Sequence, residues 1–169
     1  ALSVADMTAL GFAMPLFPLA LESLGPWLSA LAVTGVIYGS LCAFAQKDIK
    51  KLIAYSSVAH MGIVVLGLMM LNAKAVNGAM MTMLAHGIST GGLFLCVGVI
   101  YERRHTRRME DFGGLAAQMP LFTAAFLIFT LASVGLPGLS GFVGEFLILV
   151  GTMSAPRNSG LPPAMFEPA

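Results

Sequence analysis

Long apolar stretches dominate the chain, and several have the length of membrane-spanning helices. A helix needs about 20 predominantly apolar residues to cross the hydrocarbon core of a bilayer. The stretches that meet this test are 27–46, 52–71, 75–101 and 118–139. Each is bounded by charged, amide or glycine and proline residues, so we expect each stretch to form one spanning helix.

Two other apolar stretches fit this pattern less well. Stretch 2–24 is interrupted by Asp6, Glu22 and prolines. Stretch 141–153 would make roughly 20 Å of helix, which is too short to cross a bilayer alone. We therefore expect residues 1–153 to form one all-α domain, a polytopic transmembrane bundle of about five or six helices. The proline-containing tail 154–169 has no apolar periodicity, and we expect it to be disordered.

The basic residues divide unequally between the expected loops. Loop 47–51 contains three lysines and loop 102–114 contains four arginines, and both should lie on one side of the membrane. The connections expected on the other side, at 24–26, 72–74 and 140, contain only Lys74. Loops rich in lysine and arginine face the cytoplasm or its organellar equivalent. We expect a multi-pass protein of a bacterial inner (plasma) membrane with cytoplasmic basic loops.

Composition supports a membrane protein and argues against several classes of function. Hydrophobic residues make up 57% of the chain and charged residues 10%, whereas soluble domains have about 25% charged residues. A net charge of +1 does not suggest nucleic-acid binding. Cys42 and Cys96 lie in apolar stretches without nearby metal-ligand spacing. Iron–sulfur, dinucleotide and phosphate-loop motifs are absent from the sequence, so we expect no cofactor, metal or redox centre in this chain.

Polar residues recur at membrane depth on neighbouring helices. His60 and His86 each lie roughly 12–17 Å from a membrane face, near the middle of the bilayer. Candidate path-lining hydroxyls are Ser56, Ser57, Thr82, Ser89 and Thr130, with Thr90 on the same helical face as His86. Histidine exchanges protons near neutral pH, so these stripes indicate a hydrated proton relay. The alternative is that each histidine and hydroxyl only joins neighbouring helices by hydrogen bonds.

Glu145 is the strongest candidate for a functional residue. A carboxylate inside the membrane is costly and by default marks an ion or proton pathway. Glu145 follows residues 135–141, a run of glycine and proline that should break a helix. Irregular backbone at this depth is tolerated only beside protein or a water-filled cavity. The alternative is a neutral glutamic acid that is hydrogen-bonded near a helix start.

Several motifs resemble those of a known family. Stretch 46–62 (QKDIKKLIAYSSVAHMG) closely resembles the antiporter-like membrane subunits of respiratory NADH:quinone oxidoreductase, complex I. Stretch 101–107 (YERRHTR) is more specific and is similar to the subunit M family, called chain 4 in mitochondria. Stretches 85–87 (AHG), 111–116 (DFGGLA) and 141–146 (GFVGEF) complete a resemblance that covers about residues 15–153.

The resemblance implies a proton-translocating subunit of the membrane arm. It implies that Glu145 is the exit-side proton carrier, that His60 and His86 lie on the connecting path, and that Arg107 is structural. NADH, FMN, iron–sulfur clusters and quinone are implied in partner subunits rather than in this chain. The implied partners are other membrane-arm subunits of complex I, the lipid bilayer and protons.

The sequence also departs from the family pattern. Family members have more spanning helices, an upstream glutamate and lysine pair, and a lysine that would fall near Ser3. The second half of the broken helix is expected beyond Met153. We therefore expect a partial-length piece that carries the exit half of the path and does not pump alone. The alternatives are a non-pumping structural fragment, or a subunit of a cation/proton antiporter or membrane-bound hydrogenase.

Overall fold

The computed structural model describes residues 18–154, and side chains from residue 24 onward. In this range the elements are all helices, which confirms the predicted all-α fold class. One isolated β-bridge joins Asp48 and Arg108. Its elements are α2 (Pro18–Phe44), α3 (Ile49–Met69), α4 (Ala73–Arg104), η1 (Met109–Asp111), α5 (Leu115–Gln118), α6 (Pro120–Val134) and α7 (Ser140–Met153). The expected tail 154–169, apart from Ser154, and most of stretch 2–24 lie outside the described residues.

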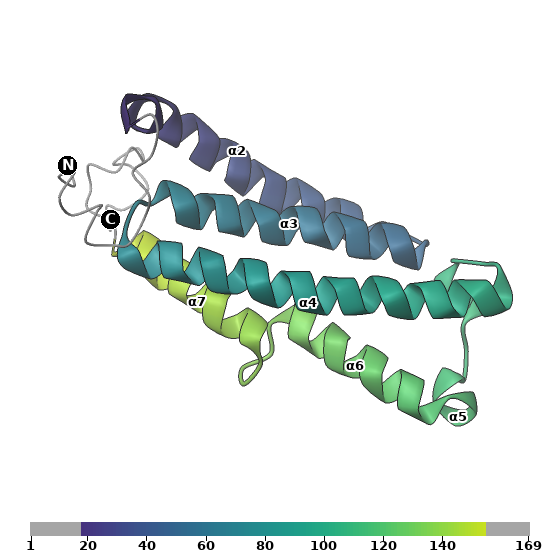
Figure 1. Cartoon of the computed structure of the whole chain (residues 1–169). Coiled ribbons are helices and arrows are strands. Elements are labelled where there is room, and N and C mark those ends of the chain that lie inside the picture. The colour runs from purple at the N-terminus through teal and green to yellow at the C-terminus, as the bar shows by residue number, and fades with distance from the viewer. Residues whose placement is uncertain (1–17, 155–169) are drawn as a thin grey trace, which may run out of the picture.

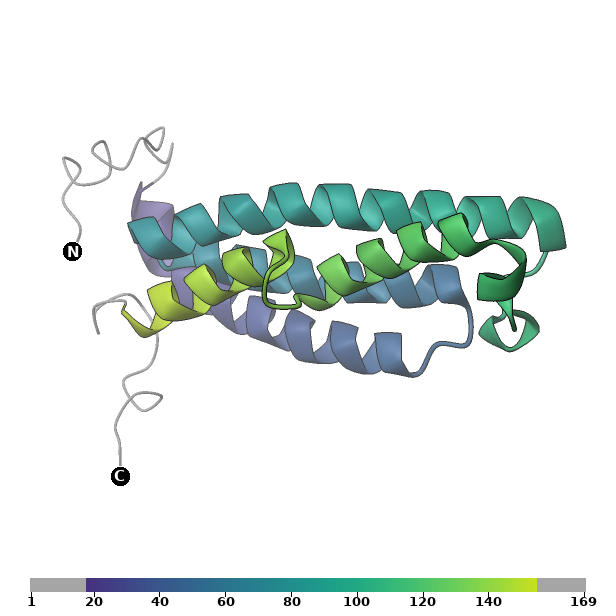
Figure 2. The same ribbon diagram turned by 90° about the horizontal axis from the view of Figure 1, so that it is seen from below.

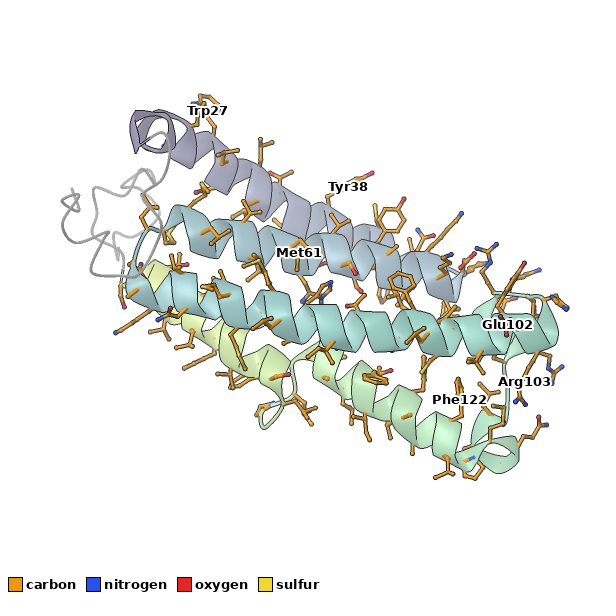
Figure 3. The ribbon with its side chains drawn as sticks, viewed as in Figure 1. Trp27, Tyr38, Met61, Glu102, Arg103 and Phe122 are labelled. Carbon is orange, nitrogen blue, oxygen red and sulfur yellow. The ribbon has the colours of Figure 1, made fainter. Side chains whose placement is uncertain are left out.

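The long helices α2, α3 and α4 lie side by side, and α6 and α7 follow one another along α4 (Figures 1 and 2). Parts of α2, α3 and α4 are long and apolar enough to cross a membrane. The outer face of α2 exposes large side chains, with Trp27 72% and Tyr38 63% exposed (Figure 3). Exposed apolar surface of this extent fits contact with lipid or with other helices.

The connection that we predicted at 24–26 is wrong, because helix α2 continues through these residues. Pro26 lies inside the helix and removes one backbone hydrogen bond. Transmembrane helices tolerate such prolines because neighbouring groups and local adjustments satisfy the freed carbonyl. The proline therefore interrupts the hydrogen-bond ladder without ending the helix.

The predicted spanning helix 118–139 is also wrong in its extent. Helix α6 has 15 residues, about 22 Å, and it ends at Gly135 with a left-handed φ of 75°. A turn through Gly138, whose φ is 104°, then leads into α7. Pro137 lacks the N–H that a continuing helix would need. The pair α6–α7 is therefore one interrupted helix that runs along α4.

This arrangement corrects two further expectations. Both halves of the broken helix are present, as α6 and α7, so the second half does not lie beyond Met153. Ser140, which we predicted as a connection at a membrane face, is the first residue of α7, and the break between α6 and α7 lies part-way along α4 (Figure 1). Composition could not distinguish one continuous spanning helix from an interrupted helix, because α6, the turn and α7 are all apolar.

The two basic loops lie at the same end of the bundle, as the prediction that they share one side of the membrane requires. The Ile49 N–H donates to the Arg107 carbonyl at 3.0 Å, and the Met109 N–H donates to the Lys47 carbonyl at 3.1 Å. The Asp48 carboxylate accepts from the Lys50 and Lys51 N–H groups and so caps α3. The two backbone hydrogen bonds tie the start of α3 to the loop that follows α4.

Helices α4 and α7 approach closely because small residues line their contact. A Cβ added to Gly78 would lie 2.7 Å from the Ile148 nitrogen, and one added to Gly151 would lie 2.5 Å from the Ala75 nitrogen. The Asn72 side chain, which caps α4, also donates to the Gly151 carbonyl at 2.8 Å. Such close packing fixes the position of α7, and hence of Glu145, against α4.

Candidate functional site

His60 and Glu145 form the centre of the candidate site. Nδ1 of His60 on α3 lies 2.8 Å from Oε1 of Glu145 on α7, and their side chains are 20% and 23% exposed. A proton between these atoms can belong to either group, because an imidazolium beside a carboxylate and a neutral imidazole beside a carboxylic acid differ only in the position of that proton. The pair therefore has the geometry for direct proton exchange.

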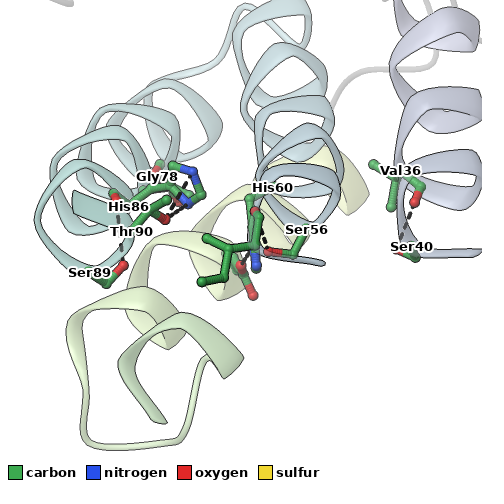
Figure 4. Close-up of polar contacts among 11 residues, drawn as sticks. Val36, Ser40, Ser56, His60, Gly78, His86, Ser89 and Thr90 are labelled. Carbon is green, nitrogen blue, oxygen red and sulfur yellow. Dashed lines mark hydrogen bonds and ion pairs between the residues drawn. The ribbon is translucent and has the colours of Figure 1, made fainter. Parts of the chain in front are cut away.

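His86 on α4 extends this pair towards a third helix. Its ring centroid lies 5.4 Å from that of His60, with the ring planes tilted by 45°. Thr90 Oγ1 lies 3.2 Å from both ring nitrogens of His86 and so fixes the ring one turn along the helix (Figure 4). Glu145, His60 and His86 therefore form a row of titratable groups contributed by α7, α3 and α4.

The break between α6 and α7 places Glu145 in this row. A Cβ added to Gly135 would lie 3.2 Å from Oε2 of Glu145, so the glycine that ends α6 lies directly against the carboxylate. The left-handed conformation of Gly135 favours a residue without a side chain. The same residue therefore ends the helix and leaves room for the carboxylate.

A groove of about 380 Å³ lies beside the His60–Glu145 pair. Its lining comes from α2, α3 and α7 and includes Val36, Ser40, Phe44, Leu52, Ser56 and Ile63 as well as the pair itself. A water molecule occupies about 30 Å³ of liquid, so the groove has room for several. The Ser40 and Ser56 hydroxyls provide polar groups in an otherwise mostly apolar lining.

The model of the NADH:quinone oxidoreductase/Mrp antiporter transmembrane family matches residues 2–161. The chain belongs to this family. NADH-quinone oxidoreductase subunit M of Rhodobacter capsulatus is 53% identical over 142 residues, which cover 84% of this chain and 28% of the relative. NADH-ubiquinone oxidoreductase chain 4 of Marchantia polymorpha is 49% identical over 150 residues, covering 89% of this chain and 30% of the relative. The predicted resemblance to subunit M/chain 4 is confirmed.

A solved structure shows the same likeness in three dimensions. Respiratory complex I from Thermus thermophilus with bound NADH contains a chain with a TM-score of 0.80 and 41% identity. The match covers 92% of this chain and 34% of that chain. This chain thus spans about a third of the length of the solved chain, and a slightly smaller share of the length of the two relatives. It corresponds to one part of a longer antiporter-family fold.

The structure brings only some of the predicted path-lining hydroxyls to this site. Ser56 lines the groove. All five hydroxyls lie near or donate to a backbone carbonyl of their own helix: Ser56 and Ser57 to Ile53, Thr82 to Gly78, Ser89 to His86 and Thr130 to Phe126. Within the described residues, none of the five bonds to a side chain of His60, His86 or Glu145. Their geometry is that of hydroxyls that satisfy their own helix.

The site also includes a residue to which the sequence assigned no role, Ser40 on α2, which lines the groove. Gly135 was predicted only as part of a helix break, and the structure places it against the carboxylate of Glu145. No sequence signal could have identified Ser40, because its position depends on how α2 packs against α3. Among the side chains that the structure describes, those of residues 24–154, no three His, Cys, Asp or Glu residues gather as metal ligands. The groups present are suited to carrying protons or to joining helices.

Proposed function

We propose that this chain belongs to a membrane-arm subunit of NADH:quinone oxidoreductase and carries the exit half of its proton path. The observation that carries the proposal is the 2.8 Å contact between His60 and Glu145 beside a groove that can hold water. Titratable pairs inside a membrane are costly and mark proton pathways. The high identity to subunit M relatives supports this function.

The proposed transfer uses groups from three helices. In the proposed step His60 starts as an imidazolium, and its Nδ1 proton passes to the Glu145 carboxylate along their direct contact. This leaves a neutral imidazole that can accept the next proton. The 5.4 Å between the His60 and His86 ring centroids is a separation that a bridging water can span. Ser56 and Ser40 can orient water in the groove, while Thr90 holds the His86 ring. Glu145 is the exit-side carrier in this scheme.

The energy source and the redox chemistry are assigned to partner subunits. In this proposal NADH oxidation and quinone reduction, with their FMN and iron–sulfur centres, take place outside this chain. Other membrane-arm subunits contact the chain, and the bacterial plasma membrane surrounds it. The basic loops at the α3 and α4 ends face the cytoplasm, a sidedness that rests on their lysine and arginine content.

The test is Glu145→Gln in the native membrane complex, with proton pumping measured alongside NADH oxidation. Glutamine keeps the size of the side chain but cannot carry a proton. Pumping per NADH should fall by about tenfold or more, because a positioned proton-transfer group contributes about 10²–10⁴ in rate. Glu102→Gln is the matched control, because Glu102 is an exposed carboxylate near the end of α4. Full pumping per NADH in an assembled Glu145→Gln complex would refute the proposal.

A second candidate follows from the family description, which includes Mrp antiporters. In that case the same His60–Glu145 pair would exchange protons against a cation gradient. Sodium-dependent proton movement without NADH oxidation would favour this function over the first. A structural fragment that only packs against other subunits is the third alternative, and it predicts assembly defects rather than pumping defects in the Glu145 variant.

A further inference from the structure

A second pocket lies at the basic-loop end of the bundle, separate from the His60–Glu145 site. It has a volume of about 420 Å³. Its lining consists of Lys50, Phe94, Val97, Gly98, Tyr101 and Arg107. The walls therefore come from the first turn of α3, the last turns of α4 and the loop that follows α4. None of these residues takes part in the proposed proton transfer.

The two cations of this pocket differ from nearby Lys47 and Arg108, which pair with a carboxylate. Glu110 pairs with Arg108 at 3.0 Å and with Lys47 at 4.0 Å. Among the residues that the structure describes, no carboxylate lies within 4 Å of the Lys50 ammonium or the Arg107 guanidinium group. The pocket thus presents two positive charges that have no carboxylate partner in the described part of the chain.

The cationic side of the pocket is held in place before any ligand binds. The Arg107 guanidinium carbon lies 5.0 Å from the centre of the Tyr101 ring, a cation–π distance. The Arg107 carbonyl accepts from the Ile49 N–H at 3.0 Å. The Lys50 N–H donates to Asp48 at 2.9 Å. A ligand would therefore meet a backbone that is already ordered.

The remaining lining is apolar and extends along α4 into the bundle. Phe94 and Val97 line this part, and a Cβ added to Gly98 would meet nothing within 4 Å. Tyr101 lies at the end of this segment, where interfacial tyrosines gather at the headgroup level of a bilayer. The pocket thus combines cations at the membrane surface with an apolar surface below them.

We infer that this pocket binds the phosphate of an anionic phospholipid between Lys50 and Arg107, with an acyl chain along Phe94, Val97 and Gly98. Arginine and lysine bind phosphate oxygens, and basic pockets between transmembrane helices on the cytoplasmic side suit anionic headgroups. The apolar surface favours a lipid over a soluble phosphate, because an acyl chain can cover it and a soluble phosphate cannot. This inference requires the chain to lie in a membrane but does not depend on the proton path.

A photoreactive lipid tests the inference at the level of the pocket. The native membrane complex is incubated with phosphatidylglycerol that carries a diazirine in its acyl chain, and crosslinks are mapped by mass spectrometry. Lys50→Gln/Arg107→Gln should lower the apparent affinity for labelling at residues 94–98 by about tenfold or more. The matched control is Lys47→Gln/Arg108→Gln, which removes the same charge from the Glu110 pairs and should leave that labelling unchanged.

Further measurements distinguish a specific lipid site from non-specific attraction of lipids to surface charge. Lys50→Gln alone leaves the Arg107–Tyr101 contact intact and should lower affinity by about fivefold, so it decides the test if the double variant fails to assemble. Phosphatidylcholine with the same diazirine should label weakly, and soluble glycerol 3-phosphate should not displace the lipid. Equal losses in both double variants, equal labelling by phosphatidylcholine, or displacement by glycerol 3-phosphate would each overturn the inference.

Discussion

At the residue scale, Gly135 affects both the backbone conformation and the position of the Glu145 carboxylate. This glycine ends α6 in a left-handed conformation and lies against Oε2 of Glu145. An alanine at position 135 would be destabilising for two separate reasons. Its backbone would be strained in the left-handed conformation, and its Cβ would crowd the Glu145 carboxylate. Only the second effect would act on proton transfer, so the two can be separated by experiment.

We predict that Gly135→Ala lowers proton pumping per NADH, because its Cβ would displace the Glu145 carboxylate from His60. Gly114→Ala is the matched control, since Gly114 also has a left-handed φ, of 68°, but no atom lies within 4 Å of an added Cβ. Both variants should lose about 1–2 kcal/mol of stability from backbone strain. Pumping measured in both should fall only in Gly135→Ala, and an equal fall would show that strain alone matters.

The sequence identified the charged members of the site but not their contact. His60 and Glu145 are recognisable because ionisable groups inside apolar segments are costly. Their 2.8 Å contact joins residues 85 positions apart on helices that are not consecutive in the chain. Such a contact depends on the packing of α7 against both α3 and α4, which no local pattern encodes.

At the element scale, the close approach of α4 and α7 holds the site together. Gly78 on α4 leaves no space for a side chain against the backbone of α7, whereas Gly91 on the same helix has nothing within 4 Å of an added Cβ. This difference provides a matched pair of substitutions within one helix.

We predict that Gly78→Ala destabilises the protein by about 1–3 kcal/mol, because the added methyl group forces the helices apart. Gly91→Ala should be neutral or stabilising by up to about 1 kcal/mol, since alanine is the better helix former. Thermal unfolding of the detergent-solubilised protein measures both. A Gly78→Ala variant as stable as Gly91→Ala would contradict the described packing.

The bounds of the helices could be predicted where polar caps mark them. Helices α3 and α4 begin after Asp48 and Asn72, close to the predicted starts at 52 and 75. Prediction failed at α6, because apolar content measures affinity for lipid and says little about where the backbone turns. The glycine and proline run at 135–138 indicated a break, but not that α6 and α7 would follow one another as two halves of one span.

At the scale of the whole molecule, the two basic loops define one end of the bundle and Lys74 lies at the other. The bridge between Asp48 and Arg108 joins the basic loops directly. Lys74 lies at the start of α4, a helix of about 48 Å that runs the length of the bundle. A membrane that crosses this bundle must therefore separate Lys74 from both basic loops.

We predict that a maleimide unable to cross membranes labels Lys51→Cys and Arg104→Cys in inside-out vesicles, and does not label Lys74→Cys. The background carries Cys42→Ala and Cys96→Ala, so that each variant has a single introduced thiol in the described residues. Vesicles of the opposite orientation should reverse the pattern. Labelling of all three positions from one side would contradict a spanning bundle with cytoplasmic basic loops.

The central claim is that His60 and Glu145 act together as one step of a proton path. The measurement that tests it most directly is pumped protons per NADH in the native complex for His60→Ala, Glu145→Gln and the double variant. We expect a smaller loss from His60→Ala than from Glu145→Gln, because water can replace a relay member. The double variant should match Glu145→Gln, since residues that act as a unit are not additive. Full pumping in Glu145→Gln, or losses that simply multiply, would contradict the account.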